Sequence, residues 1–228
     1  MTDTSAGGFA EIARQLHEEP DLEQTLDRTL ELACEAVGCD SAGVFLLHGH
    51  KRVESAAVTD TTVEKADRLQ LECGKGPCLE AMADHETFVI DDTATDPRWH
   101  EWSARVAEIG YRSVLSIRLF TNQHTIGSLN LYARRPAAFG PDEVAVGQIL
   151  GRHASVALAT ARNEDSLRQA VDARHVIGQA QGILMERFDL TVDQAFSVLR
   201  RYSQDRNLKL RAVAEEIIAS RELPSSTG

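Results

Sequence analysis

The feature that most constrains the fold of this chain is a change in the spacing of its apolar residues near residue 140. Between about 41 and 133, short apolar runs and alternating apolar and polar residues are typical of β-strands. From Pro141 to about Phe188 there is no further proline, and apolar residues recur every three or four positions, as along an α-helix. The chain therefore has to contain a sheet followed by a long helix.

Five segments before this change are predicted strands, arranged as two hairpins with one short strand between them. They are residues 42–47, 53–58, 87–91, 113–120 and 125–133. In the 113–120 segment, Val114 and Ser116 alternate with Leu115 and Ile117. Because successive side chains of a strand point to opposite faces, we expect one buried face and one face in water.

Helices are predicted on both sides of these strands. A helix over 9–38 is interrupted at Pro20 and ends at Gly38, a favourable C-terminal stop. Further segments between the strands look helical or loop-like, namely 62–69, 76–84 and 99–108. Antiparallel strands bordered by helices predict an α+β fold rather than a doubly wound parallel sheet.

The C-terminal part is predicted to be all helical. Residues 142–160 and 167–188 form a long connector helix, of a kind that often pairs in dimers, so we expect a homodimer. Thr191 and Gln194 fit a capping box at the start of the next helix. Two later apolar stripes and the end of the connector give three amphipathic helices, which can bury a small shared core.

Charge divides the chain unevenly. The 228 residues leave room for two domains, and their net charge is -11. Residues 1–162 carry 15 basic and 25 acidic side chains, whereas residues 163–228 carry 9 basic and 10 acidic ones. The acidity argues against a non-specific nucleic-acid coat or a membrane-binding surface. No transmembrane segment or export signal is visible, so we expect a cytoplasmic protein.

The residues that usually carry chemistry form no catalytic or metal-binding signature. Neither H-E-x-x-H nor G-x-S-x-G occurs, and we expect no enzyme activity and no metal. The four cysteines fall as Cys34-x4-Cys39 and Cys73-x4-Cys78. We interpret them as small buried apolar residues with reduced thiols, and zinc or a redox thiol as the less favoured alternatives.

Residues 22–160 resemble a GAF domain, a sensory module that binds small molecules. The resemblance is carried by segments within residues 38–47, 71–99 and 110–143. They include the run GKGPCLEA, a following strand with Asp91-Asp92, and the last hairpin. It implies an antiparallel sheet with a ligand cleft on one face, in a sensory domain over 9–160. The ligand is not fixed by the resemblance. Side chains that could line the cleft, or belong to the core, are Cys73, Cys78, Trp99 and Tyr111.

Residues 165–221 resemble an ANTAR domain, a three-helix family that binds RNA and prevents transcription termination. The resemblance is carried by RHVIGQAQGILMERF at 174–188 and by DLTVDQAFSVLRRYSQDRNLKLRAVAEEII at 189–218. It implies that paired RNA stem-loops are bound, usually by dimers. Gln181 is a departure, because the family often has a lysine within this run.

The candidate RNA-binding residues combine this resemblance with local charge. Basic side chains neutralise phosphates, and planar groups can stack on bases splayed from a loop. A solvated helix end that complements the helix dipole is the alternative for the same charges. Gly182 lies within a predicted helix, where glycine is less favourable than alanine, and close approach of a neighbouring helix or of RNA would explain it. The candidates are Arg174, Gln181, Gly182, Arg187, Arg200, Arg201, Asn207, Lys209 and Arg211.

The sequence thus predicts a cytoplasmic antitermination regulator, in which a ligand-sensing domain controls a C-terminal RNA-binding module. A DNA-binding regulator with a GAF-like sensor is the alternative. Against it, the 203–210 connection is longer than the tight turn of a helix-turn-helix. An enzyme with its cleft in the first domain is a further alternative, which no constellation of residues supports.

Overall fold

The computed structural model describes residues 6–49, 52–84, 86–122 and 124–220. The chain divides into two compact units, Met1–Asn163 and Glu164–Gly228. None of the described helices is both long enough and apolar enough to cross a membrane. The predicted end of the second domain at residue 221 lies outside the described residues.

The elements of the first unit follow the predicted order. The strands are β1 (Ser41–His48), β2 (Arg52–Val58), β3 (Phe88–Ile90), β4 (Ser113–Thr121) and β5 (His124–Ala133). The helices are α1 (Ala6–Glu18), α2 (Leu22–Val37), α3 (Thr61–Cys73), α4 (Pro77–Asp84) and α5 (His100–Glu108), followed by α6 (Pro141–Phe188). The predicted 9–38 helix is interrupted as expected, and α2 is capped by Gly38 in the left-handed conformation, with φ of 74°.

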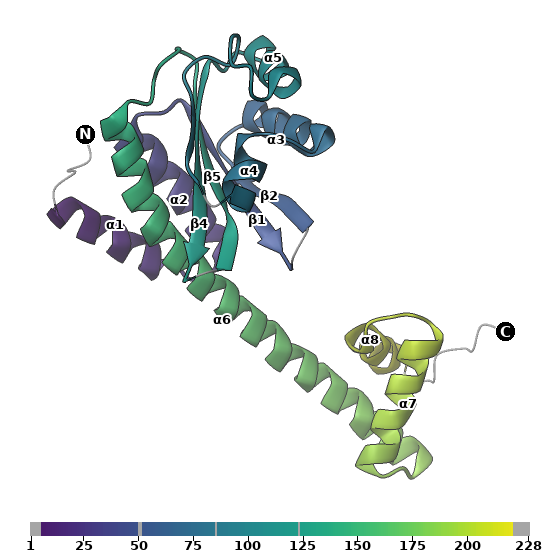
Figure 1. Cartoon of the computed structure of the whole chain (residues 1–228). Coiled ribbons are helices and arrows are strands. Elements are labelled where there is room, and N and C mark those ends of the chain that lie inside the picture. The colour runs from purple at the N-terminus through teal and green to yellow at the C-terminus, as the bar shows by residue number, and fades with distance from the viewer. Residues whose placement is uncertain (1–5, 50–51, 85, 123, 221–228) are drawn as a thin grey trace. The chain divides into compact units, whose positions relative to one another are not determined.

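The strands form one antiparallel sheet in the order β2-β1-β5-β4-β3, with helices on both faces (Figure 1). This is the predicted α+β fold. The β4–β5 hairpin pairs Leu115 with Leu131 and Ser116 with Asn130. Neighbouring residues of each strand therefore face opposite helical layers.

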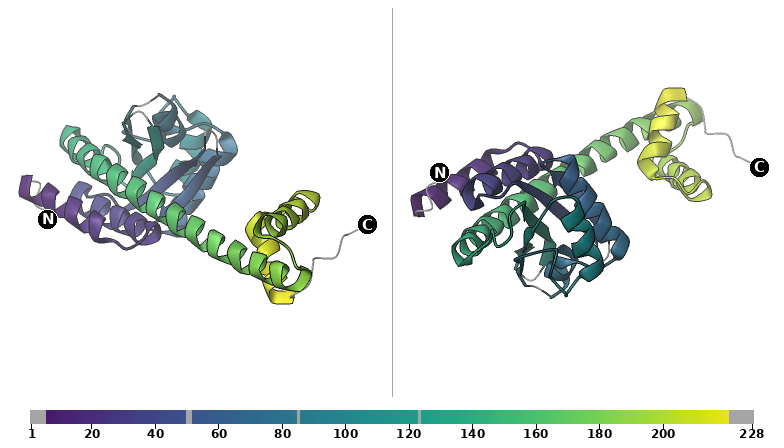
Figure 2. Two further views of the ribbon diagram at one scale, coloured as in Figure 1. Left: turned by 90° about the horizontal axis from the view of Figure 1, so that it is seen from below. Right: turned by 90° about the horizontal axis from the view of Figure 1, so that it is seen from above.

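One face of the sheet is apolar and is covered by α2 and the first part of α6 (Figures 1 and 2). Leu115, Ile117 and Leu131 lie in this core. Glycines allow α6 to approach β4 closely, because a Cβ atom at Gly147 would lie only 2.8 Å from the Ile117 side chain, and one at Gly151 only 3.0 Å. Small residues at one helical turn's spacing thus fix this contact.

The opposite face, called the polar face below, carries polar side chains next to apolar ones such as Val114, and it is also buried, which corrects the expectation of a face in water. Ser116, Asn130 and Tyr132 on this face are all 0% exposed. Helices α3 and α4 cover them, and a Cβ at Gly43 would lie 2.9 Å from Val63 of α3. Two helices from a distant part of the sequence therefore seal the face that β4 alone predicts to be wet.

The second unit is a three-helix module, as predicted. The end of α6 packs with α7 (Val192–Asp205) and α8 (Leu210–Ser220) around Ala180, Leu184 and Leu199. Thr191 and Gln194 form the expected capping box at the start of α7. The α7–α8 connection spans only residues 206–209, not the expected 203–210. Loop length therefore does not separate this module from a helix-turn-helix.

Candidate nucleic-acid interface and sensory site

The nine predicted RNA-binding residues come from all three helices of the second unit. Arg174, Gln181, Gly182 and Arg187 lie on α6, Arg200 and Arg201 on α7, Asn207 and Lys209 in the connection, and Arg211 on α8. Eight of the nine are exposed, the exception being Gln181, which is half-buried. Apart from Gln181, these side chains surround the core of the unit rather than contribute to it.

Four basic side chains among the described residues of the module are engaged in ion pairs. Arg168 pairs with Glu164 and Asp165 along α6. Arg206 lies 2.6 Å from Glu216, and Arg211 lies 2.8 Å from Glu215. Arg201 approaches Asp205 at 3.6 Å, with 82% of its side chain exposed. Exposed pairs of this kind are weak, so Arg201 and Arg211 can exchange their carboxylate for a phosphate.

Four other cations form no ion pair within the described residues: Arg174, Arg187, Arg200 and Lys209. Along α7, Arg200 follows Val192 and Phe196 at four-residue intervals, so the three share a helix face. Val192 is 56% exposed and Phe196 is 40% exposed. An exposed aromatic ring beside an unpaired guanidinium can stack on a base while the cation contacts phosphate.

Gln181 and Gly182 differ from the other candidates in their surroundings. The Gln181 amide donates a hydrogen bond to the carbonyl oxygen of Val192 at 3.2 Å, so it holds the start of α7 against α6. A Cβ atom at Gly182 would meet no atom within 4 Å. A neighbouring helix of this chain is therefore not the reason for glycine at this position.

Tyr202 and Asn207 have local structural roles. Tyr202 packs against the module's core. Asn207 adopts a positive φ of 49° in the connection between α7 and α8. Asparagine tolerates this conformation better than most residues, which explains its place in the turn.

In the first unit, a buried polar cluster lies between the sheet and helices α3 and α4. Asp67 accepts hydrogen bonds from the hydroxyls of Ser55 at 2.5 Å and Tyr132 at 3.3 Å. The Cys78 sulfur accepts a hydrogen bond from the Gln70 amide at 2.9 Å, and the Ser116 hydroxyl lies 3.3 Å from it. Residues from five elements thus meet on the polar face of the sheet.

Burial changes the acidity of this cluster. Desolvation raises the pKa of the Asp67 carboxyl to about 7, although hydrogen bonds from Ser55 and Tyr132 oppose the change. Burial also raises the pKa of the Cys78 thiol to about 12. Cys78 is therefore a neutral thiol, unlike a reactive cysteine.

Two side chains of β5 next to this cluster have unsatisfied polar atoms. The oxygen and nitrogen of the Asn130 amide are both buried and have no hydrogen-bond partner among the described residues, and the same holds for the Ser128 hydroxyl. On the paired strand β4, one terminal nitrogen of Arg118 is also buried without a partner. Unsatisfied buried groups are costly, so these atoms are candidates for hydrogen bonds with a water molecule or a ligand.

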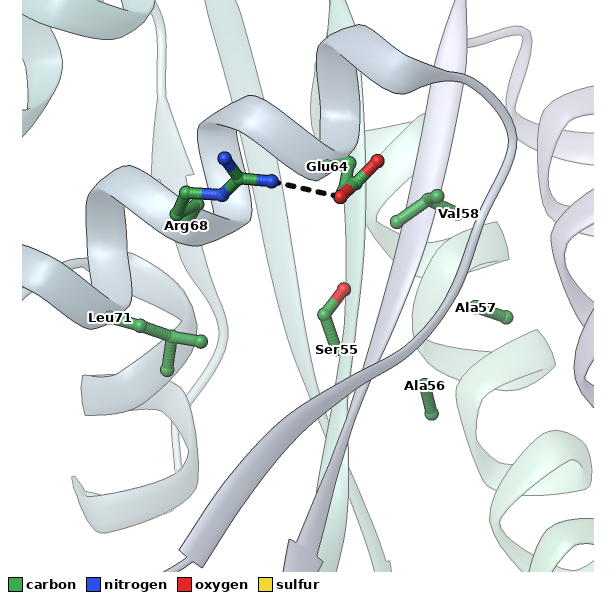
Figure 3. Close-up of a pocket in the computed structure, with 7 residues that line it drawn as sticks. All are labelled: Ser55, Ala56, Ala57, Val58, Glu64, Arg68 and Leu71. Atoms are coloured by element: carbon green, nitrogen blue, oxygen red, sulfur yellow. Dashed lines mark hydrogen bonds and ion pairs between the residues drawn. The ribbon is translucent and has the colours of Figure 1, made fainter.

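Two surface pockets adjoin this layer. One, of about 360 Å³, lies between β2 and α3, with the Glu64–Arg68 ion pair along its helical side (Figure 3). Its wall includes Ser55, whose hydroxyl reaches Asp67. Cys73 and Trp99 line a second pocket of about 170 Å³, as the cleft prediction allowed, whereas Cys78 and Tyr111 are fully buried.

The sequence-based analysis missed Asp67, Gln70 and Asn130. Asp67 and Gln70 lie three residues apart on α3, a spacing that places both on one helix face with the apolar Val63 and Ala66. Polar residues on an apolar face were the available signal. Among the described residues, no group of three or more histidine, cysteine or acidic side chains is arranged to hold a metal ion.

Comparisons with known proteins agree with both units. The family model of the GAF domain matches residues 19–159, and that of the ANTAR domain matches residues 165–218. No curated protein matches the chain.

Solved structures resemble the first unit. The GAF domain of a phosphoenolpyruvate-protein phosphotransferase from Coxiella burnetii is 21% identical, with 69% of this chain and 94% of that chain covered and a TM-score of 0.56. The corresponding Acinetobacter domain is 17% identical, covers 72% and 97%, and has a TM-score of 0.56. Free methionine-R-sulfoxide reductase from Neisseria meningitidis is 19% identical, covers 68% and 89%, and has a TM-score of 0.50. These likenesses show the fold.

Proposed function

This chain belongs to the GAF domain family and carries an ANTAR domain after its sensory unit, and on that basis we propose that it is a transcription antitermination regulator that binds RNA stem-loops. The sensory domain is assigned to residues 9–160 and the RNA-binding domain to 165–221. The proposal includes a cytoplasmic setting, where transcripts are made, and no catalytic activity.

One observation carries the RNA-binding proposal. The second unit has almost no net charge, yet Arg200 and Lys209 are exposed and have no ion pair among the described residues, and Phe196 is exposed beside Arg200. Unpaired cations gain most from contact with phosphate, because no internal carboxylate has to be displaced. The exposed ring offers a stacking surface for an unpaired base.

The test compares RNA that carries two stem-loops with duplex DNA of matched length, using the full chain in gel shifts at fixed salt. We expect the double variant Arg200→Ala/Lys209→Ala to bind the RNA roughly tenfold or more weakly. Arg14→Ala, which removes one exposed charge from α1, is the matched control and is expected to bind normally. Preferred binding to duplex DNA would favour the DNA-binding alternative, and unchanged binding by the double variant would refute the proposed interface.

We further propose that the chain acts as a homodimer through α6. Leu167 and Val171 of this helix are 67% and 64% exposed, which is unusual for large apolar side chains. A second copy of α6 is the occupant that would cover both, since they lie four residues apart on one face. Sedimentation equilibrium is expected to give a dimer for the full chain and a monomer for Leu167→Glu/Val171→Glu. A monomeric wild type would contradict the proposal.

The sensory input is assigned to the polar face of the sheet. A small ligand with both hydrogen-bond donors and acceptors could satisfy the Asn130 amide and the Ser128 hydroxyl, which have no partner in the part of the chain that the structure describes. Nucleotides and other small polar metabolites can be screened by thermal shift of the full chain. A true ligand is expected to raise the melting temperature of the wild type, to leave that of Asn130→Leu unchanged, and to alter RNA affinity. A ligand that stabilises both proteins equally binds elsewhere.

A further inference from the structure

Cys34 and Cys39 bring two free thiols together at the end of α2. Their sulfur atoms lie 3.4 Å apart, and both residues are half-buried rather than enclosed. Cys34 belongs to the last turn of α2, and Cys39 lies two residues before β1. The sulfurs are thus little more than one ångström beyond bonding distance.

From this geometry we propose that Cys34 and Cys39 are a reversible redox site, which a hydroperoxide converts to an intramolecular disulfide. The site is separate from the polar cluster and from the second unit. It would give the first unit an oxidant input that does not depend on the small-molecule ligand.

The roles of the two sulfurs follow from their contact. The Cys39 thiol donates its hydrogen bond to the Cys34 sulfur, which lowers the pKa of Cys34 and raises that of Cys39. The nearby carboxylates of Glu35, Asp40 and Asp60 oppose the lowering at Cys34. Cys34 is therefore the thiol that reacts first, and Cys39 resolves the product.

The chemistry balances in two steps. The Cys34 thiolate attacks one peroxide oxygen, the O–O bond breaks, and the released alkoxide takes a proton from solvent, which leaves a sulfenic acid on Cys34. The Cys39 sulfur then attacks the Cys34 sulfur, the S–O bond breaks, and the hydroxyl leaves as water with the Cys39 proton. The two sulfurs are oxidised together by two electrons, and the hydroperoxide is reduced to an alcohol and water.

The bridge would span the C-terminal cap of α2. The carbonyl oxygen of Cys34 already accepts the amide hydrogen of Gly38 at 3.0 Å, so the segment is folded back before any bond forms. The same end of the helix meets α6, since Val37 lies 3.8 Å from where a Cβ of Gly147 would stand. Oxidation would therefore act at the packing contact between the end of α2 and α6.

The other two cysteines provide the contrast. Cys78 is fully buried, and its sulfur accepts hydrogen bonds on the polar face of the sheet. Cys73 is half-buried like Cys34, but no second sulfur is in contact with it among the described residues. Cys73 is thus the matched control for exposure without a partner thiol.

The test uses the full, reduced chain. It is treated with a small excess of hydrogen peroxide, alkylated with N-ethylmaleimide in denaturant, digested with trypsin and analysed by mass spectrometry. Trypsin cleaves after Arg28 and Lys51, so Cys34 and Cys39 fall in one peptide, 29–51, whereas Cys73 and Cys78 fall in two others. We expect peptide 29–51 without alkyl groups and two hydrogens lighter than its reduced form, and recovery of the free thiols after treatment with dithiothreitol.

Three variants assign the roles. Cys39→Ser is expected to accumulate a sulfenic acid on Cys34 that dimedone traps, and Cys34→Ser to slow oxidation of this peptide about tenfold or more. Cys73→Ser is expected to form the bridge as the wild type does. Alkylation of both cysteines in the peroxide-treated wild type, faster oxidation of Cys73, or a product that is only an intermolecular disulfide would each overturn the proposal.

Discussion

The two units keep their polar groups in opposite places. The first unit buries Asp67, Gln70 and Asn130 between the sheet and helices α3 and α4, whereas the second surrounds a small apolar core with exposed arginines and one exposed lysine. Buried polar groups favour a small ligand that forms the hydrogen bonds they lack. Exposed cationic groups can contact a large polyanion such as a nucleic acid. In the function we propose, signals are received inside the first unit and delivered on the surface of the second.

The largest expected effect is a difference in the loss of unfolding free energy between substitutions on the two faces of the sheet. Leu115→Ala on the apolar face is expected to lower the free energy of unfolding by about 2–5 kcal/mol, because it leaves a cavity in a packed core. Ser116→Ala, one residue along on the polar face, should cost about 1 kcal/mol or less. Urea unfolding followed by tryptophan fluorescence measures both, since Trp99 and Trp102 are in the first unit. Equal losses would mean that the two faces do not differ as described.

A second prediction concerns pH. The pKa of Asp67 is raised to about 7 in the folded chain from a usual 3.8, so between these values the folded state holds a proton that the unfolded state has lost. The free energy of unfolding therefore falls as pH rises through this window, and the effect is complete above about 7. Asp67→Asn should remove this slope.

The exposed Asp27 serves as the control for that measurement, because Asp27→Asn should leave the slope unchanged. Asp92, whose pKa is lowered by its hydrogen bonds with Arg112, affects stability only at lower pH. If stability instead rises between about 4 and 7, Asp67 is ionised in the folded chain.

A third prediction tests whether the unsatisfied amide serves function rather than stability. Asn130→Leu should raise the free energy of unfolding by roughly 1–2 kcal/mol, because it removes two buried polar atoms that lack partners. The exposed Asn163→Leu is the control and should change stability little. Destabilisation by Asn130→Leu would show that the amide has a structural role.

The smallest expected effect is in the salt dependence of RNA binding. Arg200→Ala should reduce the slope of log affinity against log salt concentration by about 1, as expected for one lost phosphate contact. Asn130→Leu should leave this slope unchanged, because its side chain is buried in the other unit. A change of slope caused by Asn130→Leu would break the division of roles between the units.

Local patterns were enough to predict the strands, the interruption at Pro20, the capping box at Thr191 and the three-helix module. Wrong predictions arose where distant segments meet. The wet face of β4 is buried because α3 and α4 return to cover it, and nothing in the 113–120 segment encodes that contact. Asp67 was missed for the same reason, since an aspartate within a helix usually faces water.

In the second unit, the positive charge of the surface could be predicted from the sequence, but the individual ion pairs and hydrogen bonds could not. Exposed arginines are visible in the sequence as a cluster of charge, but their ion pairs depend on how α7 and α8 are placed. Thus the Arg206–Glu216 pair joins residues from two elements and could not be read from spacing. Gln181 likewise gained its partner, the Val192 carbonyl, only through the fold.

The glycines of α6 divide this helix into stretches of very different mutational tolerance. At Gly147 and Gly151 a Cβ atom would lie 2.8 and 3.0 Å from the Ile117 side chain, so alanine requires that side chain to shift and larger residues should be disfavoured in a saturation library. At Gly178, where a Cβ meets nothing within 4 Å, alanine should be accepted and should strengthen the helix by roughly 0.5–1 kcal/mol. One continuous helix thus contains positions where added volume meets a packed side chain and a position where it meets open space.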